Sequence, residues 1–391
     1  MASSLPAART HAESTTPARA GRAHLAVSTI FFVNGVVLAS WVPHIPAVKA
    51  RFALSDGALG FLLLAMAVGA VVALPLSGWL VGRHGSRAMT SACAVALCLV
   101  LPLPLLAPSV AAAGLALALL GACNALLDVS MNAQAVEVER RHRHAIMSSF
   151  HALFSGGGLI GAVLAGSVMA LGAGDVSHVL GAAFVSLLAV AASLPHLLPS
   201  PPAAGSQGPV LVRPTGPLAR LGALAFCGLL AEGAMADWSA VYLHDGLGSS
   251  PATAALGFAA FSLAMAIGRA AGDTIVARFG PEHVLRTSAA MAAVGLTTAL
   301  LVATPAVGIA GCGLVGLGIS NVIPILFSAA GRMPGAQPGA ALAAVATAGY
   351  AGFLAGPPLI GLVADWAGIG VGLGVVSVLC GLIALRAGAV R

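Results

Sequence analysis

The sequence predicts an all-α integral membrane protein with about twelve transmembrane helices in two pseudo-symmetric six-helix bundles. Apolar residues make up 59% of the 391-residue chain, charged residues only 8%, and the mean hydropathy is +1.00. The apolar residues fall into runs long enough to span a bilayer, and one long proline-rich segment divides the chain. A soluble domain carries roughly 25% charged residues. The composition therefore excludes a soluble enzyme, a disordered scaffold and a nucleic-acid-binding domain.

Twelve apolar runs account for the predicted helices. A transmembrane helix needs about 20 predominantly apolar residues. Runs of this length lie near 24–45, 57–82, 88–107, 109–135, 146–172, 177–198, 219–243, 252–277, 287–304, 306–330, 339–364 and 369–388. Prolines alone mark the turns within 88–135 and 287–330, at Pro102 to Pro108 and at Pro305.

The proline-rich segment sets the expected domain boundaries. Six prolines lie from Pro199 to Pro217, which excludes a continuous helix there. The first 22 residues are polar and contain no apolar run. We expect a disordered cytoplasmic tail at 1–22, a six-helix bundle at 23–198, a cytoplasmic linker at 199–218 and a second six-helix bundle at 219–391.

The distribution of basic residues predicts the orientation. The chain has 18 basic residues. If the N-terminus is cytoplasmic, only Lys49 and Arg51 fall outside and Arg269 is embedded, while all the others fall on the cytoplasmic side. The positive-inside rule therefore predicts a multi-pass protein with both termini in the cytoplasm. The Ala-, Gly- and Arg-rich composition suggests a bacterial chain, and thus the cytoplasmic (inner) membrane.

Three pairs of short motifs indicate an internal repeat. Arg83-His84-Gly85 matches Arg278-Phe279-Gly280 at an offset of 195, Gly158–Gly161 matches Pro358–Gly361 at 200, and Asn34-Gly35 matches Glu232-Gly233 at 198. Repeated six-helix halves are an architecture of secondary transporters, which bind their substrate near the midplane between the halves.

The segment from Gly78 to Arg87 resembles the loop signature of the major facilitator superfamily, G-x-x-x-D-R-x-G-R-R, with Gly82 in the acidic position. The resemblance covers residues 24–390. It implies a cytoplasmic gate in which arginines dock onto helix ends and glycines allow close helix packing. The implied gating residues are Gly78, Arg83, Gly85, Arg87, Arg269, Asp273, Arg278 and Gly280. The alternative is a set of arginines that only mark tight turns on the cytoplasmic side.

The run at 109–135 carries the main candidate for substrate or proton binding. Asn124, Asp128 and Asn132 are spaced i, i+4, i+8 and so share one helix face. A carboxyl group in the bilayer is costly unless it faces a cavity or a partner. We interpret Asp128 as a substrate or proton site, with a structural carboxylate as the alternative.

This run also resembles the fucose-permease-like branch of the superfamily and its uncharacterised bacterial relatives, whose fourth helix places a carboxylate four residues before an asparagine. In that branch the first helix carries a second carboxylate, where this chain offers only Asn34. The run has no arginine and the next run has no Gly-Pro pair. Both features are usual in proton-coupled drug antiporters, so the resemblance implies symport.

Further polar and aromatic residues complete the predicted site. Glu232 is expected near mid-membrane, whereas Asp237 is expected near the outer mouth and on a different helix face. An interfacial aromatic belt is the alternative for Trp238, and ordinary packing is the alternative for the histidine and asparagines. The family architecture implies a cavity lined by the first, fourth, seventh and tenth helices. The predicted substrate or proton site comprises Asp128, Asn132, Asn124, Glu232, Asn34, His151, Asn321, Trp238 and Trp41.

These observations favour a secondary active transporter that moves a small solute by alternating access through proton-coupled symport. The resemblance implies a sugar or related metabolite as the substrate. A proton-coupled multidrug or metabolite exporter is one alternative, and a non-transporting membrane sensor is another. The six cysteines lie in apolar runs, and no metal-ligand or nucleophile–base spacing occurs. We expect no enzyme activity and no cofactor; the expected partners are the solute, protons and the lipid bilayer, and the family implies a monomer.

Overall fold

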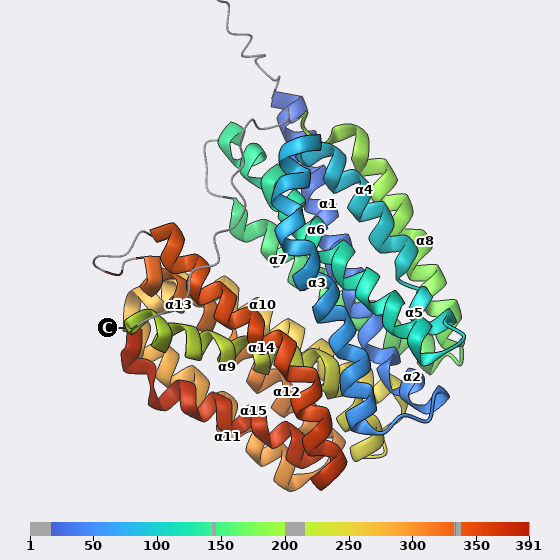
Figure 1. Cartoon of the computed structure of the whole chain (residues 1–391), viewed down its shortest axis with the longest axis vertical. Helices are drawn as coiled ribbons and strands as arrows, with labels where there is room; N and C mark the ends of the chain where they lie inside the picture. The colour runs from blue at the N-terminus through green and yellow to red at the C-terminus, as the bar shows by residue number, and fades with distance from the viewer. Residues whose placement is uncertain (1–16, 143–145, 200–215, 332, 334–337, 391) are drawn as a thin grey trace, which may run out of the picture.

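The computed structural model describes residues 17–142, 146–199, 216–331, 333 and 338–390 (Figure 1). Within these ranges the regular structure is helical, without strands. Much of the predicted tail and linker, at 1–16 and 200–215, lies outside the described residues. The helix α1 begins at Pro17, so residues 17–22, expected in the tail, are helical.

The first half of the chain comprises α1 (Pro17–Trp41), α2 (Ile45–Arg51), α3 (Asp56–His84), α4 (Ser86–Val100), α5 (Leu103–Leu106), α6 (Val110–His142), α7 (Met147–Ala170) and α8 (Asp175–Ser193). The second half comprises α9 (Pro217–Val241), α10 (Pro251–Phe279), α11 (Pro281–Val302), α12 (Pro305–Ile319), α13 (Val322–Gly331), α14 (Pro338–Ala367) and α15 (Ile369–Leu385). Single helical turns continue several of these helices, at η1 (Val42–His44), η2 (Leu194–His196), η3 (Tyr242–Gly246) and η4 (Ala387–Val390).

The predicted fold class is confirmed. In the described part of the chain, 11 helical segments are long and apolar enough to cross a membrane, and α15 is a shorter apolar helix. They match the twelve predicted runs in order. The turns expected at Pro102 to Pro108 and at Pro305 separate α5 from α6 and α11 from α12.

The helices of the two halves pack in the same pattern. In the first half α1 packs on α7 and α3 on α6, and in the second α9 packs on α14 and α10 on α12. The halves meet where α7 contacts α10 and where α3 contacts α14. Figure 1 shows the resulting two bundles, inclined to one another, with the starts of α1 and α9 far apart.

Matched caps show the repeat at residue level. Gly85 ends α3 at φ 80° and Gly280 ends α10 at φ 79°, conformations that favour glycine. At the other ends of these helices, Ser55 and Ser250 each accept a hydrogen bond of 3.2 Å from a backbone N–H of the first turn. We call the end of the molecule at Gly85 and Gly280 the basic end, and the end at Ser55 and Ser250 the opposite end.

One of the three predicted motif pairs, Gly158–Gly161 with Pro358–Gly361, is in a different register in the structure. A Cβ on Gly161 would lie 2.6 Å from the carbonyl oxygen of Val36 in α1, and the nearest neighbour of Gly356 is Leu230 in α9. The contacts therefore relate Gly161 to Gly356, at the same offset of 195 as the two glycine caps. Gly361, expected to match Gly161, instead packs against α3 of the other half.

The predicted gating residues divide between two locations. At the basic end the Arg83 guanidinium carbon lies 5.3 Å from the centre of the Trp79 ring, and Arg278 lies at 5.3 Å from Phe279. Arg87 donates to two backbone carbonyls beyond the end of α8, at 3.5 and 3.4 Å. The side chains at positions 78 and 273 lie outside the described residues. Arg269 lies elsewhere, in the cavity described next.

Candidate functional site

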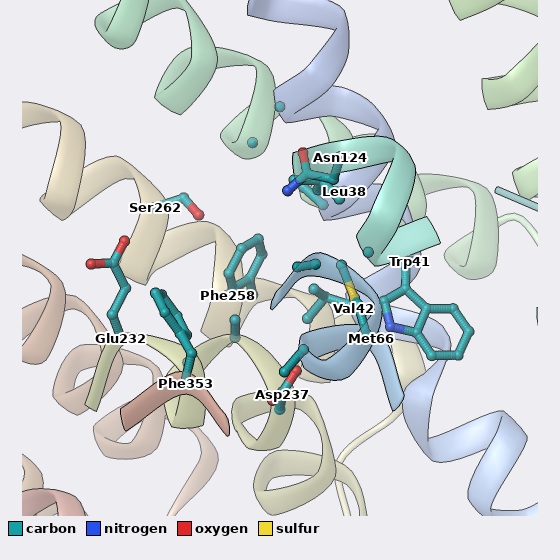
Figure 2. A pocket seen from close by; sticks show the side chains of 18 of the residues that line it. Leu38, Trp41, Val42, Met66, Asn124, Glu232, Asp237, Phe258, Ser262 and Phe353 are labelled. Atoms are coloured by element: carbon teal, nitrogen blue, oxygen red, sulfur yellow. The ribbon is translucent and has the colours of Figure 1, made fainter. Parts of the chain in front are cut away.

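A cavity of about 360 Å³ lies between the two halves (Figure 2). It is lined by α1, α3, α6 and α7 of the first half and by α9, α10 and α14 of the second. Much of its wall is aromatic, from Trp41, Phe154, Phe258, Phe261, Tyr350 and Phe353. Of the predicted site residues, it brings together Trp41, Asn124 and Glu232.

Glu232 and Arg269 form an ion pair within this cavity. Arg269 of α10 donates to the two carboxylate oxygens of Glu232 in α9, at 3.1 and 3.4 Å. Arg269 lies ten residues before the end of α10, or about 15 Å from the basic end. Arg269 is therefore embedded, as the sequence predicts, and lies in the cavity away from the loop at the basic end; its gating role stays a prediction.

His151 approaches this ion pair from the other half. It lies on α7, close enough to Arg269 for electrostatic interaction. Its ring also packs edge-on against Phe31, with the ring centres 5.4 Å apart. His151 does not line the cavity but faces the charged group from across the contact between α7 and α10.

Asp237 lines the same cavity, as Figure 2 shows. It follows Glu232 by five residues in α9 and so lies about 7.5 Å nearer the opposite end. Its carboxylate has no hydrogen-bond or ion-pair partner among the residues that the structure describes. The sequence places Asp237 near the outer mouth and on a different helix face from Glu232, and therefore outside the predicted site. Gly233 and Ala236 also line the cavity, so the cavity contacts a wide arc of α9 that includes both carboxylates.

Two uncharged polar atoms in the cavity wall are also without a protein partner. The Asn124 carbonyl oxygen and the Trp41 indole N–H are buried and make no hydrogen bond in the described part of the chain. Most buried polar groups in proteins are hydrogen-bonded. One acceptor and one donor in the wall are therefore unpaired, and both are shielded from the open space of the cavity in this structure.

Asp128 lies one helical turn from Asn124, toward the basic end, and does not line the cavity. The Asn132 amide donates to its carboxylate at 3.1 Å and to its backbone carbonyl at 2.8 Å. Tyr350 of α14 lies close enough to interact with it electrostatically. Tyr350 also lines the cavity, so Asp128 lies in the neighbourhood of a residue of the cavity wall.

Three other predicted residues are packed within one half. Asn34 is buried and its amide donates to the Met131 sulfur at 3.9 Å. Trp238 is fully buried inside the second half, so the alternative of an interfacial aromatic belt is wrong for it. Asn321 lies at the break between α12 and α13 and donates to the Gly268 carbonyl of α10 at 2.9 Å.

The cavity differs from the expected arrangement of lining helices. The tenth span, α12 and α13, contributes no described lining residue, whereas α3, α7, α10 and α14 do. The packing of Asn321 against α10 explains in part why the described residues of the tenth span do not line the cavity. Its side chain fills the space beside Gly272, where a Cβ would lie 2.0 Å from the amide oxygen, and thereby ties the tenth span to α10.

Polar contacts join the two halves at the opposite end. The Lys49 ammonium lies 2.7 Å from Asp56 in its own half and 2.7 Å from Asp245 of the second half. Ser55 donates to Asp365 of α14 at 2.9 Å. The two halves are thus connected beyond the end of the cavity at which Asp237 lies.

Comparison with known proteins identifies relatives along almost the whole chain. The sequence model of the Major Facilitator Superfamily matches residues 27–243. An uncharacterised MFS-type transporter of Yersinia pestis is 38% identical over 364 residues, covering 92% of this chain and 94% of that protein. The membrane protein MosC of Rhizobium meliloti is 35% identical over 348 residues, covering 88% and 84%. The structure of a D-xylose-proton symporter is similar in fold, with a TM-score of 0.74 at 15% identity, covering 94% of this chain and 97% of that one.

Proposed function

The chain belongs to the major facilitator superfamily and is a multi-pass membrane transporter of a small solute; from that premise we propose that it is a proton-coupled symporter. The observation that carries the proposal is the cavity between the halves, with lining residues from both. A solute in this cavity contacts both bundles. Their relative movement can therefore expose it to either side of the membrane in turn.

The contacts between the halves support this mode of transport. Lys49 to Asp245 and Ser55 to Asp365 join the halves at the opposite end. We assign the basic end to the cytoplasm, because most arginines lie there. In this assignment both termini are cytoplasmic, and the Lys49 and Ser55 contacts hold the extracellular side together. They must break before the cavity can open outward.

We assign proton coupling to Asp128 and Glu232. Glu232 holds Arg269 at 3.1 Å, and a proton on Glu232 would release that arginine. Asp128 of the first half interacts with Tyr350 of the second, so a proton there changes a contact between the halves. Both carboxylates therefore connect a protonation event to groups that line the cavity.

The resemblance of α6 to the fucose-permease-like branch favours a sugar or related metabolite as the solute. The cavity volume of about 360 Å³ lies within the range of about 300–1,000 Å³ that is usual for small-molecule sites. Aromatic rings from both halves, including Trp41 and Phe353, can pack against the faces of a sugar ring. Asn124 and Glu232 supply hydrogen-bonding groups.

Uptake into proteoliposomes tests the proposal. Labelled glucose, glucosamine and glucuronate would be offered to wild type and to Asp128→Asn, with and without an inward proton gradient. We expect saturable uptake that the gradient stimulates in wild type, and loss of that stimulation in Asp128→Asn while exchange of the solute without a gradient persists. Glu282→Gln, which removes one carboxylate at the start of α11, is the control.

Three results contradict this proposal in different ways. Accumulation that is equal with and without the gradient would exclude coupling. Movement of solute against the proton flow would favour the exporter. Binding of a sugar without any uptake would favour the non-transporting sensor.

A further inference from the structure

The cavity contains one carboxylate without a partner, that of Asp237. Its side chain lines the cavity, and no described group of the protein donates to it. Asp237 has no assigned part in proton coupling, which we place at Asp128 and Glu232. A carboxylate in a membrane protein is expensive unless something compensates its charge. A ligand or its own proton must therefore supply the compensation.

The other charged groups that line the cavity compensate each other. Glu232 and Arg269 neutralise each other at 3.1 Å. Among the described lining residues Arg269 is the one basic group, with no lysine or histidine. Lys49, toward the opposite end, is held at 2.7 Å by both Asp56 and Asp245. The charge of an ionised Asp237 therefore leaves the cavity with one excess negative charge.

The walls near this carboxylate suit an organic cation. Phe258, Phe353 and Trp41 line the same cavity as Asp237 and give it an aromatic wall (Figure 2). A cation over an aromatic ring gains favourable electrostatic energy, more so when it is desolvated.

We propose that the transported solute carries a protonated amine and that Asp237 binds it. The ammonium group pairs with the Asp237 carboxylate, and the body of the solute packs against the aromatic wall. An anionic solute would meet the excess negative charge, and a neutral polyol would leave it uncompensated. This inference rests on the proposed function, because it assumes that the cavity is the transport site.

Two matched sets of compounds test the inference by thermal stability and equilibrium binding in detergent. One set is benzylamine, benzyl alcohol and benzoate, and the other is glucosamine, glucose and glucuronate. Within each set the size is similar, and one substituent is an ammonium, a hydroxyl or a carboxylate group. In wild type we expect an amine to bind at least tenfold more tightly than its alcohol and its acid.

Variants at Asp237 test whether its carboxylate causes the preference for amines. Asp237→Asn should weaken binding of the amine at least tenfold and reduce its preference over the alcohol. Asp237→Glu keeps the charge and should retain the preference, which separates loss of charge from loss of fold. Glu282→Gln also removes one carboxylate, far from the cavity, and should bind as wild type does.

The possible failures are distinguishable. Binding of glucose or of an acid that equals or exceeds binding of the amine overturns the inference but leaves the cavity as the transport site. Amine binding that is unchanged in Asp237→Asn overturns it as well. If none of the six compounds binds or is taken up, the inference is overturned together with the assignment of a sugar-like solute.

Discussion

The two halves of this transporter share a backbone design but differ in the chemistry that they bring to the cavity. Gly85 and Gly280 end equivalent helices with φ of 80° and 79°. The charged lining residues nevertheless all come from the second half, as Glu232, Asp237 and Arg269, whereas the polar lining residues of the first half are uncharged. The repeat therefore sets the architecture, and the residues that select a solute have diverged within it.

The comparison predicts the largest loss of uptake for a variant that breaks the Glu232–Arg269 ion pair of the second half. Glu232→Gln leaves Arg269 without its partner in a partly buried position, with side chains exposed by 34% and 26%. Removing one member of a fully buried pair costs about 3–5 kcal/mol, and this exposure makes the expected cost smaller. We expect uptake in proteoliposomes to fall by roughly 10- to 100-fold.

The double variant Glu232→Gln, Arg269→Gln separates stability from coupling. It removes both charges, so its thermal stability should return toward that of wild type while gradient-stimulated uptake stays absent. Glu282 and Arg286 form an ion pair at 2.8 Å in the same half but do not line the cavity, so breaking that pair should leave gradient-stimulated uptake unchanged. Restored coupled uptake in the double variant would show that the Glu232 pair is only structural.

The second-largest predicted effect tests whether the two halves share the same backbone conformation at the glycines that end α3 and α10. Gly85→Ala and Gly280→Ala each place a side chain at positive φ with ψ near 150°, a region that is essentially restricted to glycine. No atom lies within 4 Å of a Cβ added at Gly280, so the cost there is that of the backbone alone. We expect a backbone cost of about 1–3 kcal/mol at each glycine, measured as a fall in melting temperature in detergent.

Gly181→Ala is the control for this pair. Gly181 lies within α8, also has open space around an added Cβ, and lacks positive φ. Alanine is favoured over glycine there by up to about 1 kcal/mol. A loss at only one of Gly85 and Gly280 would contradict the equivalence of the two loops.

The sequence predicts the architecture well because the bilayer imposes it. Helix length and apolar composition predicted the twelve runs, and Pro305 was sufficient to divide α11 from α12. The site was harder to predict. A spacing of five separated Glu232 from Asp237 on a helical wheel, but a cavity that contacts a wide arc of α9 includes both. Asn321 is equally polar, yet its side chain packs against α10 and not in the cavity. That contact depends on the space left by the neighbouring glycines of α10, which a reading of one helix at a time does not reveal.

The smallest predicted effect compares one tryptophan from each half. Trp41 and Trp238 are both buried, and neither indole N–H has a partner among the described residues. Trp41 lines the cavity, whereas Trp238 is enclosed within the second half. Since the sequence proposed both for the site, exchanging each for phenylalanine shows which of them a solute contacts.

Trp41→Phe keeps a ring in the cavity wall but removes the donor. A hydrogen bond contributes about 0.5–1.5 kcal/mol net, so we expect affinity for whichever of the six compounds binds to fall by roughly 3- to 10-fold. Both exchanges remove ring volume from a buried side chain, so both should lower the melting temperature. Trp238→Phe differs in binding: Trp238 does not line the cavity, so affinity should stay within about twofold of wild type. If Trp238→Phe instead weakens binding as much as Trp41→Phe, the solute must reach a part of the second half that the cavity seen here does not include, and the division of roles between the halves would need to be redrawn.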